Sequence, residues 1–518
     1  MSKRKGPPPI VYIALAAIVG GSGFWFLKNR PSSAGGPSLP TQVFQLGTSD
    51  LLVLGDTFSG YSTFRNAEFQ SALADAEITL RYEDEFDQSA RADRFSKGEA
   101  DLMVTTLDQY LKHQPQGQIV GLIDRTVGAD AVVLNTPQYG IKSINDLGKL
   151  TQEASQQGQP LKLVYAVDTP SEYLANVLDI RFEGFNLADF DVIEVAEASE
   201  AWALMQDPSQ NIAVAVLWEP FVTQAQKAGH TVALSSKDAP NAILDVMVAS
   251  DRLVKKNPET VSKVLSAYYR RIDTSMRDGT VLKAQIQTDG GLSSSDAAVV
   301  MQGIDFFTSV EANQWMTDGT LAKRIEATAA VLTLAGQLDQ VPAQPDSYYT
   351  TDFISNAVAN TQALIDVIKI DNPELAAILE GAAVQEQTTT PQLEASAVTA
   401  APTIGNLQVT GEVKFATGSA NIAPEGQQTL NQLAEEIKEF NVQTVAVRVI
   451  GHTSKTGSAA LNQQLSQQRA QVVVNYLKQK GVGNNIVAEG KGFNEPLAGI
   501  APADVKNQRT EIRLVRVN

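Results

Sequence analysis

Between positions 50 and 250, the chain alternates short apolar segments with longer amphipathic ones. Two of the longer segments, 198–205 and 221–229, repeat apolar residues with the period of a helix. Short buried strands that alternate with helices are typical of a mainly parallel sheet covered on both faces. The pattern therefore predicts an α/β fold. The predicted strands lie at 51–54, 78–82, 102–104, 131–134, 162–166 and 213–217.

The pattern changes after Asn257. Residues 258–380 have a helical period almost throughout, and Asn257 followed by Pro258 suits the first positions of a helix. Further on, 425–440 predicts an amphipathic helix and 445–450 a strand. The apolar face of that helix carries Leu430, Leu433, Ile437 and Phe440.

Two segments have the composition of linkers. Residues 28–40 are rich in Pro, Gly and Ser, and residues 384–403 are rich in Thr, Ala and Gln with few large apolar side chains. Such segments cannot bury enough apolar surface to offset the entropy lost on ordering. We therefore expect two folded domains, at 41–383 and 404–518, in this chain of 518 residues.

The N-terminal segment determines the expected compartment. Basic residues precede an apolar run at 10–27, and about 18 residues in a helix span roughly 27 Å, close to the thickness of a bilayer core. We predict a transmembrane anchor there, with 1–9 as a cytoplasmic basic tail. A cleaved signal peptide is the alternative. Either interpretation places the rest of the chain outside the cytoplasm.

Composition narrows the functional classes. A formal net charge of −17 disfavours nucleic acid as a partner, because phosphates need clustered Lys and Arg. The chain has no cysteine, which excludes disulfides, thiolate nucleophiles, Cys-bound metals and the lipid attachment of a lipoprotein. Its histidines, His113, His230 and His452, lie far apart in the sequence. We therefore expect no cofactor and no enzymatic activity.

Six motifs between about residues 45 and 250 occur in the order and spacing of a known family. They are Gly55 with Gly60-Tyr61, KGEAD at 97–101, DRTVGADA at 124–131, SINDL at 143–147, TPSEY at 169–173 and LWEP at 217–220. Together they resemble periplasmic solute-binding proteins of the nitrate/sulfonate/taurine class of ABC transporters, the SsuA/TauA-like proteins. The resemblance implies a two-lobed periplasmic-binding-protein fold, type II-like, whose lobes close on a ligand in the cleft between them.

Hydroxyl side chains follow two of the predicted strands. Thr105 and Thr106 come after one strand, and Thr169 and Ser171 come after another. Open α/β sheets bind ligands beyond the carboxyl ends of their strands, where helix N-termini present free N–H groups. We expect these hydroxyls to contact an anion, and the alternative for each is a plain helix N-cap.

Four further residues complete the expected ligand site. Tyr61 and Trp218 are candidate walls of the cleft, with core packing as the alternative. Arg125 is a candidate contact for the anion, and a structural ion pair with Asp124 is its alternative. Glu219 would repel an anion unless it contacts an amine, so a zwitterion such as taurine suits the whole set. The resemblance thus implies a small anionic or zwitterionic ligand.

The segment 404–518 carries a second set of motifs. It contains GHTSKTG from Gly451, NQQLSQQRA from Asn462 and NQRTEI from Asn507. These motifs resemble the C-terminal domain of OmpA, which Pal and MotB-type proteins share. The resemblance implies a β-α-β-α-β sandwich, OmpA-like, that binds peptidoglycan without a covalent bond. The residues that it assigns to this binding are Thr453, Ser454, Asn462 and Arg469.

Arg469 and Ser454 decide what the resemblance implies about specificity. Arg469 matches the family's arginine, which together with an aspartate holds the diaminopimelate of the stem peptide. Ser454 stands in the position of that aspartate. A neutral hydrogen bond in place of a charge-assisted one lowers affinity roughly tenfold. We therefore expect the OmpA-like fold and peptidoglycan binding, with a weakened preference for diaminopimelate.

The two resemblances together predict an envelope solute-binding protein, anchored in the inner membrane, with its bulk in the periplasm of a Gram-negative type of envelope. It would bind a small solute and peptidoglycan, and deliver the solute to an ABC permease or another membrane partner. The alternative is a structural protein that links inner membrane and cell wall, whose first domain is a sensor or spacer. An enzyme like the thiamine-pyrimidine synthases of the same fold class would need a cysteine-rich iron site, which this chain lacks.

Overall fold

The computed structural model describes residues 50–381, 392–409, 413–415 and 419–517. The predicted basic tail, membrane anchor and first linker, at 1–40, lie outside these ranges. Within the described ranges, no helix is both long enough and apolar enough to cross a membrane.

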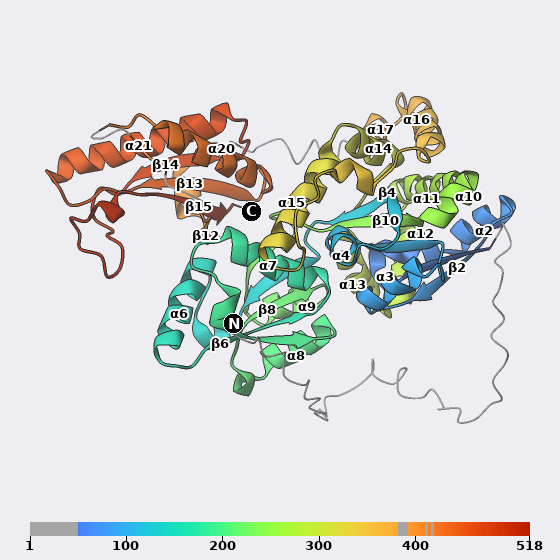
Figure 1. Ribbon diagram of the computed structural model, residues 1–518, viewed down its shortest axis with the longest axis horizontal. Helices are drawn as coiled ribbons and strands as arrows, with labels where there is room; N and C mark the ends of the chain where they lie inside the picture. Colours follow the sequence, from blue (N-terminus) through green and yellow to red (C-terminus); the bar gives the residue numbers. More distant parts are fainter. Residues whose placement is uncertain (1–49, 382–391, 410–412, 416–418, 518) are drawn as a thin grey trace, which may run out of the picture. The chain divides into compact units, whose positions relative to one another are not determined.

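The first lobe is built on a six-stranded sheet (Figure 1). Its strands are β1 Asp50–Gly55, β2 Thr79–Asp84, β3 Leu102–Thr106, β4 Gly117–Thr126, β10 Leu244–Ser250 and β11 Ile304–Phe306. They follow the order β11-β4-β10-β3-β1-β2. β1 is parallel to β2 and β3, whereas β10 is antiparallel to both β3 and β4. The apolar run predicted at 102–104 is a central strand in which every residue is buried.

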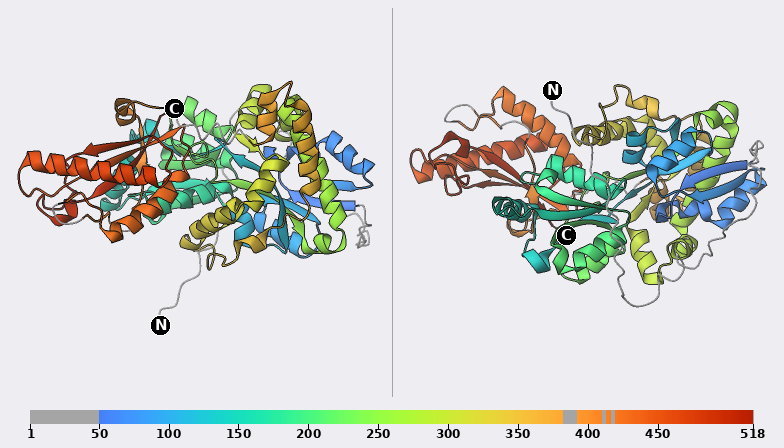
Figure 2. Two further views of the ribbon diagram at one scale, coloured as in Figure 1. Left: turned by 90° about the horizontal axis from the view of Figure 1, so that it is seen from above. Right: turned by 60° about the horizontal axis from the view of Figure 1, so that its bottom comes forward.

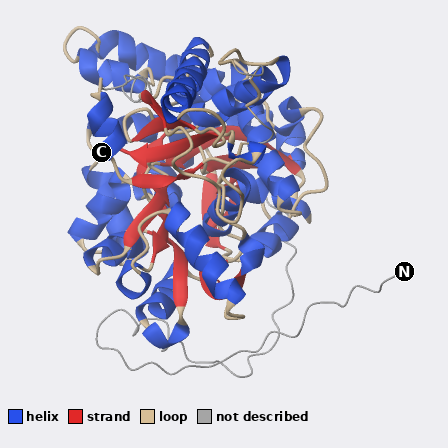
Figure 3. Cartoon of the chain, turned by 90° about the vertical axis from the view of Figure 1, so that its left-hand side faces the viewer, coloured by secondary structure: helices blue, strands red, loops and turns tan. Residues whose placement is uncertain are grey.

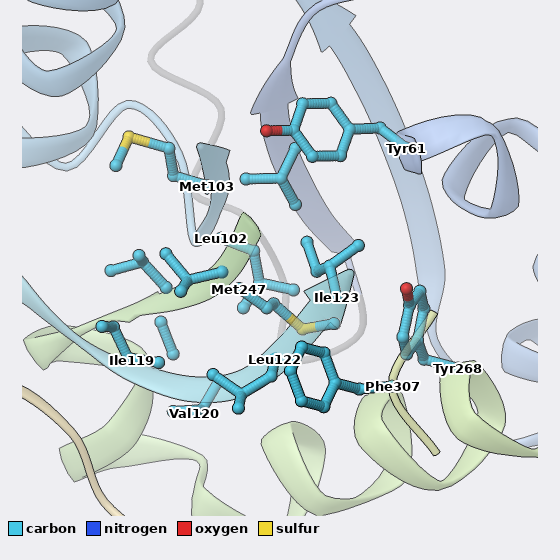
Figure 4. Close-up of a cluster of buried hydrophobic side chains, with 14 of the residues drawn as sticks. Tyr61, Leu102, Met103, Ile119, Val120, Leu122, Ile123, Met247, Tyr268 and Phe307 are labelled. Carbon is cyan, nitrogen blue, oxygen red and sulfur yellow. The ribbon is translucent and has the colours of Figure 1, made fainter. Parts of the chain in front are cut away.

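Helices lie beside the strands of the described chain (Figure 3), and the helices of the first lobe cover its sheet. Pro258 opens the longest of them with Asn257 at its N-cap position, as predicted. Figure 4 shows part of the core that they cover, where Tyr61, Tyr268 and Phe307 lie among aliphatic strand residues. The helices are η1 Ser59–Tyr61, α1 Ser62–Arg65, α2 Ala67–Asp75, α3 Gln88–Ser96, α4 Leu107–His113, α10 Asp251–Lys256, α11 Pro258–Arg277, α12 Thr280–Gly290, α13 Ser294–Gln302, α14 Ser309–Thr317, α15 Thr320–Leu334, η4 Pro345–Tyr348, α16 Ser355–Ile368 and α17 Pro373–Leu379.

The second lobe has a five-stranded sheet in the order β7-β6-β8-β5-β9 (Figures 1 and 2). Its strands are β5 Asp130–Leu134, β6 Leu161–Ala166, β7 Phe190–Val195, β8 Ile212–Trp218 and β9 Thr231–Ser235. Its helices are α5 Thr136–Tyr139, α6 Ile144–Gln156, α7 Pro170–Arg181, η2 Leu187–Asp189, α8 Ala198–Gln206, η3 Pro208–Gln210 and α9 Phe221–Lys227. Leu163 packs with Leu174 of α7 in one apolar cluster, and Val164 packs with Trp202 of α8 in another. Neighbouring residues of one strand thus serve opposite faces, so both faces are covered.

Two crossings join the lobes. The chain leaves the first sheet after β4 and enters the second at β5, and it returns from β9 into β10. We call the surroundings of these crossings the interlobe junction. The predicted two-lobed binding-protein fold is confirmed in this topology.

The C-terminal segment forms a separate four-stranded sheet in the order β12-β15-β13-β14. Its strands are β12 Thr403–Asn406, β13 Val445–Gly451, β14 Ile486–Gly490 and β15 Thr510–Arg516. Its helices are α19 Ala395–Ala400, α20 Pro424–Lys438, α21 Ala459–Gln479 and η5 Val505–Asn507. The predicted apolar face is buried, since Leu430, Leu433, Ile437 and Phe440 are each at most 3% exposed. The predicted OmpA-like α/β sandwich is therefore confirmed.

Two local predictions differ from the structure. Part of the second predicted linker forms α19, because Val398 is fully buried against Ala446 and Val515. The strand expected at the start of the C-terminal domain is limited, within the described residues, to a bridge between Phe415 and Ile422. A single apolar residue that finds a partner is enough to order a short segment whose composition suggests a linker.

Candidate functional site

Thr105 and Thr106 lie where the sequence places them, at the end of β3 and the start of α4. The Thr105 hydroxyl donates to Gln88 Oε1 at 3.1 Å. Thr106 occupies the N-cap position of α4, and its hydroxyl faces the carboxyl of Asp108. Asp108 is buried, and this burial raises its pKa. The first lobe therefore presents a hydroxyl and a protonatable carboxyl together at this strand end.

Thr169 and Ser171 of the second lobe differ in what their hydroxyls do. Thr169 caps α7: its Oγ1 accepts from the Ser171 backbone N–H at 3.2 Å and donates to the Ala166 carbonyl at 2.7 Å. Its hydrogen-bonding capacity is largely used by the helix. The Ser171 hydroxyl is fully buried and makes no hydrogen bond within the described part of the chain. Of the two, Ser171 is the one left free to bind a ligand.

Arg125 lies in the core and is held by acidic partners. Its guanidinium bonds to Asp305 at 2.7 Å and Glu311 at 2.8 Å, and it stacks on the ring of Phe307 at 4.7 Å. The side chain is only 2% exposed. The ion pair proposed as its alternative role is therefore present, but with Asp305 and Glu311 in place of Asp124. Because two carboxylates already balance its charge, this geometry gives no support to Arg125 as an anion contact.

Tyr61, Trp218 and Glu219 also lie around the interlobe junction. Tyr61 is 2% exposed and its hydroxyl donates to Asp245 Oδ1, so it packs as a core residue. Trp218 ends β8 and is half-buried. Glu219 accepts from the backbone N–H and the hydroxyl of Thr223 at 3.1 and 2.9 Å, which caps α9. Trp218 is thus the predicted wall with an accessible face.

Sequence reasoning did not single out the buried carboxyls at the crossings. Asp124 in β4 and Asp245 in β10 are register partners, and both are fully buried. Burial and neighbouring carboxyls raise the pKa of Asp124 well above its usual value, and burial raises that of Asp245 to about 8. Burial likewise raises the pKa of Asp130, at the start of β5, to about 7. An acidic residue at the edge of a buried apolar run is the pattern that marks each of them.

The C-terminal site joins the two residues that the motif pairs. Arg469 donates to Gln508 Oε1 at 3.4 Å, and the Gln508 amide donates to Ser454 Oγ at 3.1 Å. The guanidinium also donates to the Ser419 carbonyl at 3.0 Å and lies over the ring of Phe415 at 4.9 Å. Within the described residues, Arg469 forms no ion pair, and burial lowers its pKa. An unbalanced guanidinium of this kind suits a carboxylate ligand.

The other predicted residues of this site shape the turn around it. Asn462 donates to the carbonyls of Thr456 and Ser458 at 2.8 and 3.1 Å, which is a structural role. The Thr453 hydroxyl is buried and has no partner within the described residues. Gln508 belongs to the NQRTEI motif but was not assigned a role, because only the fold brings it between Arg469 and Ser454.

Comparison with known proteins bears on the two parts separately. Residues 414–510 match the sequence profile of the OmpA family. Over 98 residues, or 19% of this chain, the sequence is 42% identical to outer membrane protein A of Shimwellia blattae, of which the match covers 41%. Over 96 residues, or 18%, it is 41% identical to outer membrane protein A of Klebsiella pneumoniae, of which the match covers 28%. The chain thus spans less than half of either curated relative.

Among solved structures, the periplasmic aliphatic sulphonate binding protein SsuA from Escherichia coli is similar to the two-lobed part. The likeness covers 59% of this chain and 99% of that protein, with 13% identity and a TM-score of 0.46. The sequence match to the OmpA family and the four-stranded sheet with its packed helices agree on the other part. Residues 414–510 of this chain therefore form an OmpA-like domain.

Proposed function

We propose that this chain captures a small solute between its two lobes, outside the cytoplasm, while its OmpA-like domain holds it to peptidoglycan. The observation that carries the proposal is an ion pair between the lobes. Lys112 of α4 in the first lobe bonds to Asp168 and Glu172 of the second lobe, at 2.7 and 3.2 Å. Two lobes that are linked by two crossings and held together by such a pair are built to close on a ligand.

The proposed ligand contacts come from both lobes. Thr106 stands at a strand end of the first lobe, and Ser171 and Trp218 stand at the corresponding ends of strands in the second. Ligands of open α/β sheets bind at such ends. The SsuA likeness and the motif order support a transport role, with an ABC permease as the proposed membrane partner and 10–27 as the proposed inner-membrane anchor.

The proposed peptidoglycan site is the Arg469 guanidinium with Gln508 and Ser454 beside it. A guanidinium binds a carboxylate with two parallel hydrogen bonds, and stem peptides of peptidoglycan carry carboxylates. Ser454 offers a neutral oxygen in place of a charged one. We therefore propose that this domain binds the wall through a carboxylate and makes weaker use of an ammonium.

Two measurements on the full chain test the proposal. The first is thermal unfolding in the presence of small anions, zwitterions and amines, in which a bound solute raises the midpoint. The second is co-sedimentation with purified peptidoglycan. The proposal expects a response in both. A folded chain that responds to no solute but still sediments with peptidoglycan would support the spacer alternative.

A further inference from the structure

Carboxyls from both lobes converge at the interlobe junction. Asp56 follows β1 of the first lobe, and Glu197 precedes α8 of the second. They are close enough that Asp56, after burial, raises the pKa of Glu197. Asp245 is likewise within electrostatic range of Asp56, Asp108 and Asp130, and Asp130 of Glu219. We call this set the junction carboxyls: Asp56, Asp108, Asp124, Asp130, Glu197, Glu219 and Asp245.

The buried cations near this set are already balanced. Arg91 is fully buried and bonds to Asp56 at 2.7 Å, and it also donates to two backbone carbonyls. Arg125 is balanced by Asp305 and Glu311. Lys112 is balanced by the acidic pair of the second lobe that it bridges. Lys227 is the cation near Glu219. Within the described residues, no ion pair joins the other junction carboxyls, Asp108, Asp124, Asp130, Glu197 and Asp245, to a cation.

The centre of the set contains acceptors without donors. Asp124 and Asp245 hydrogen-bond to each other through a proton, and this contact contributes to the raised pKa of Asp124. Apart from that contact, neither oxygen of Asp124 nor Oδ2 of Asp245 accepts a hydrogen bond from a described N–H or O–H group. Asp124 Oδ2 lies so close to Gly60 that a Cβ there would be 2.2 Å from it, which directs this oxygen at the loop after β1. Buried acceptors are rarely left without a donor, so a donor from outside the chain is expected here.

A tyrosine gives independent support for a missing donor. Tyr268 of α11, which Figure 4 labels, is within electrostatic range of Asp124 and Asp245, because burial and then these two carboxyls raise its pKa. Its hydroxyl is 0% exposed and has no hydrogen-bond partner in the described part of the chain. The hydroxyl of Ser171 in the second lobe is likewise fully buried and has no hydrogen-bond partner among the described residues. Orphaned hydroxyls and orphaned carboxylates together outline a place for a group that carries several N–H donors.

We propose that the solute captured between the lobes is a small organic amine, whose ammonium group binds to Asp124, Asp245 and Tyr268. An ammonium has three N–H donors and one positive charge, which fits three oxygen acceptors in an acidic site. The half-buried face of Trp218 suits the apolar or cationic remainder of such a ligand. This inference rests on the proposed capture function and replaces the anion that the family resemblance implies.

An organic cation fits the site better than a metal ion does. Within the described residues, no group of three or more His, Asp or Glu side chains is arranged to hold a metal. The amine therefore remains the occupant to test.

Calorimetric titration of the full chain tests the proposal with matched probes. Putrescine and butylamine supply ammonium groups, choline supplies a cation without N–H donors, and butanesulfonate supplies the anion of similar size. The proposal expects binding of at least one primary amine, at least tenfold weaker binding of choline, and none of butanesulfonate. Binding of butanesulfonate in place of the amines would overturn the amine assignment and leave solute capture intact. Binding of none of the four probes by the folded chain would overturn the amine assignment. The thermal unfolding screen with the wider set of solutes then decides whether the chain captures a solute.

Variants locate the binding on the junction carboxyls. Glu197→Gln removes one charge from an exposed position, so the fold is expected to survive. We expect it to weaken amine binding about threefold to tenfold, as loss of one nearby charge does. Asp75→Asn on the exposed end of α2 removes the same charge far from the site and is expected to leave affinity unchanged. Equal effects of Glu197→Gln and Asp75→Asn on amine affinity would contradict the assignment. So would unchanged amine affinity in both Glu197→Gln and Asp245→Asn, provided that these variants are folded.

Discussion

The interlobe junction and the OmpA-like domain bury charge in opposite ways. In the junction, Asp124 and Asp245 lie in adjacent strands, and burial raises both pKa values, that of Asp245 to about 8. In the OmpA-like domain, burial acts on Glu511 too, but hydrogen bonds from His452 and Arg509 outweigh it and lower the pKa to about 2. One site keeps carboxyls without cations, whereas the other surrounds its carboxylate with cations.

The arginines of the two regions differ in the opposite sense: the one near the junction has carboxylate partners, and the one in the OmpA-like domain has none among the described residues. Arg125 of the first lobe is balanced by Asp305 and Glu311, whereas Arg469 of the OmpA-like domain faces no described carboxylate. A buried charge with its partners present is part of the structure, and one without them is a candidate for ligand binding. By this criterion the first site is prepared for a cation and the second for an anion.

The largest expected effect is on stability, from breaking the pair of Arg125. Arg125→Met leaves Asp305 and the buried Glu311 without a cation, and we expect a loss of about 3–5 kcal/mol in the free energy of unfolding. Denaturant titration measures it. Lys255→Met, which breaks an exposed pair with Asp251, is the control, with an expected loss below about 1 kcal/mol. A small stability change together with lost solute binding would restore Arg125 as a ligand contact.

The next effect is on wall binding. Arg469→Ala removes the unbalanced guanidinium, and we expect the dissociation constant for peptidoglycan to rise about tenfold to a hundredfold, as the loss of a charge-assisted bond implies. Co-sedimentation with purified peptidoglycan measures it. Lys478→Ala, on the exposed end of the same helix, serves as the control. Unchanged sedimentation of the Arg469 variant would show that the anion site lies elsewhere.

The contrast in pKa predicts how stability depends on pH. Asp130 and Asp245 have folded pKa values of about 7 and 8, above the unfolded value, so the folded state retains protons and loses stability as pH rises from about 4 to 8. Glu511 has a lowered pKa, so its contribution is present above about pH 4.3 and is lost as pH falls toward 2. The ligand-free chain should therefore melt highest near pH 4 to 5. Thermal unfolding across pH 2 to 9 checks this, and a maximum near pH 8 would contradict it.

Amine binding should follow the opposite course with pH. Protonation of the junction carboxyls removes the charge that attracts an ammonium, so affinity is expected to fall as pH drops from 8 to 5. The stabilising effect of the ligand would then be greatest where the ligand-free chain is weakest. Affinity that is constant over this range would place the amine away from Asp130 and Asp245.

A smaller effect concerns the serine in the OmpA-like domain. Ser454→Asp places a carboxylate at the position bridged through Gln508 to Arg469. We expect binding to diaminopimelate-containing peptidoglycan to improve about tenfold, since a charge-assisted bond replaces a neutral one. Ser454→Asn, which adds size without charge, is the matched control. An equal gain from both variants would show that charge is not the missing feature.

The smallest effect separates two neighbouring hydroxyls. Thr169→Ala removes the cap of α7 and is expected to cost about 1 kcal/mol of stability with no change in solute affinity. Ser171→Ala removes a hydroxyl that bonds to no described group and is expected to weaken solute binding while stability is unchanged. Denaturant and ligand titrations of both variants measure this. A loss of solute affinity in Thr169→Ala together with a loss of stability in Ser171→Ala would contradict the roles that we assign to these two hydroxyls.

Features that depend on residues close together in the sequence were predictable, and features that depend on residues far apart in the sequence were not. The strands at 102–104 and 213–217 and the apolar face of α20 were predictable, because burial periodicity is a local property. β4 and β10 were missed, and each carries an aspartate at the edge of its apolar run. The motif resemblance paired Ser454 with Arg469, and in the structure Gln508 links the two side chains.

The charge of the solute site was not predictable from local pattern. Asp124 and Asp245 lie far apart in the sequence and become neighbours only through strand pairing, and Arg125 finds its partner Asp305 180 positions away. Family motifs preserve the fold while side-chain charge at the junction is free to differ. The resemblance therefore gave the lobes correctly and suggested an anion, where the assembled carboxyls favour a cation.

Thermal unfolding of the full chain at pH 8, with butylamine and butanesulfonate in parallel, tests the central claim most directly. The two probes have similar size and opposite charge, so any difference between them reports the charge that the interlobe junction accepts. Our account predicts that the amine raises the unfolding midpoint and the sulfonate leaves it unchanged. A midpoint raised by the sulfonate alone would contradict it and restore an anion as the solute.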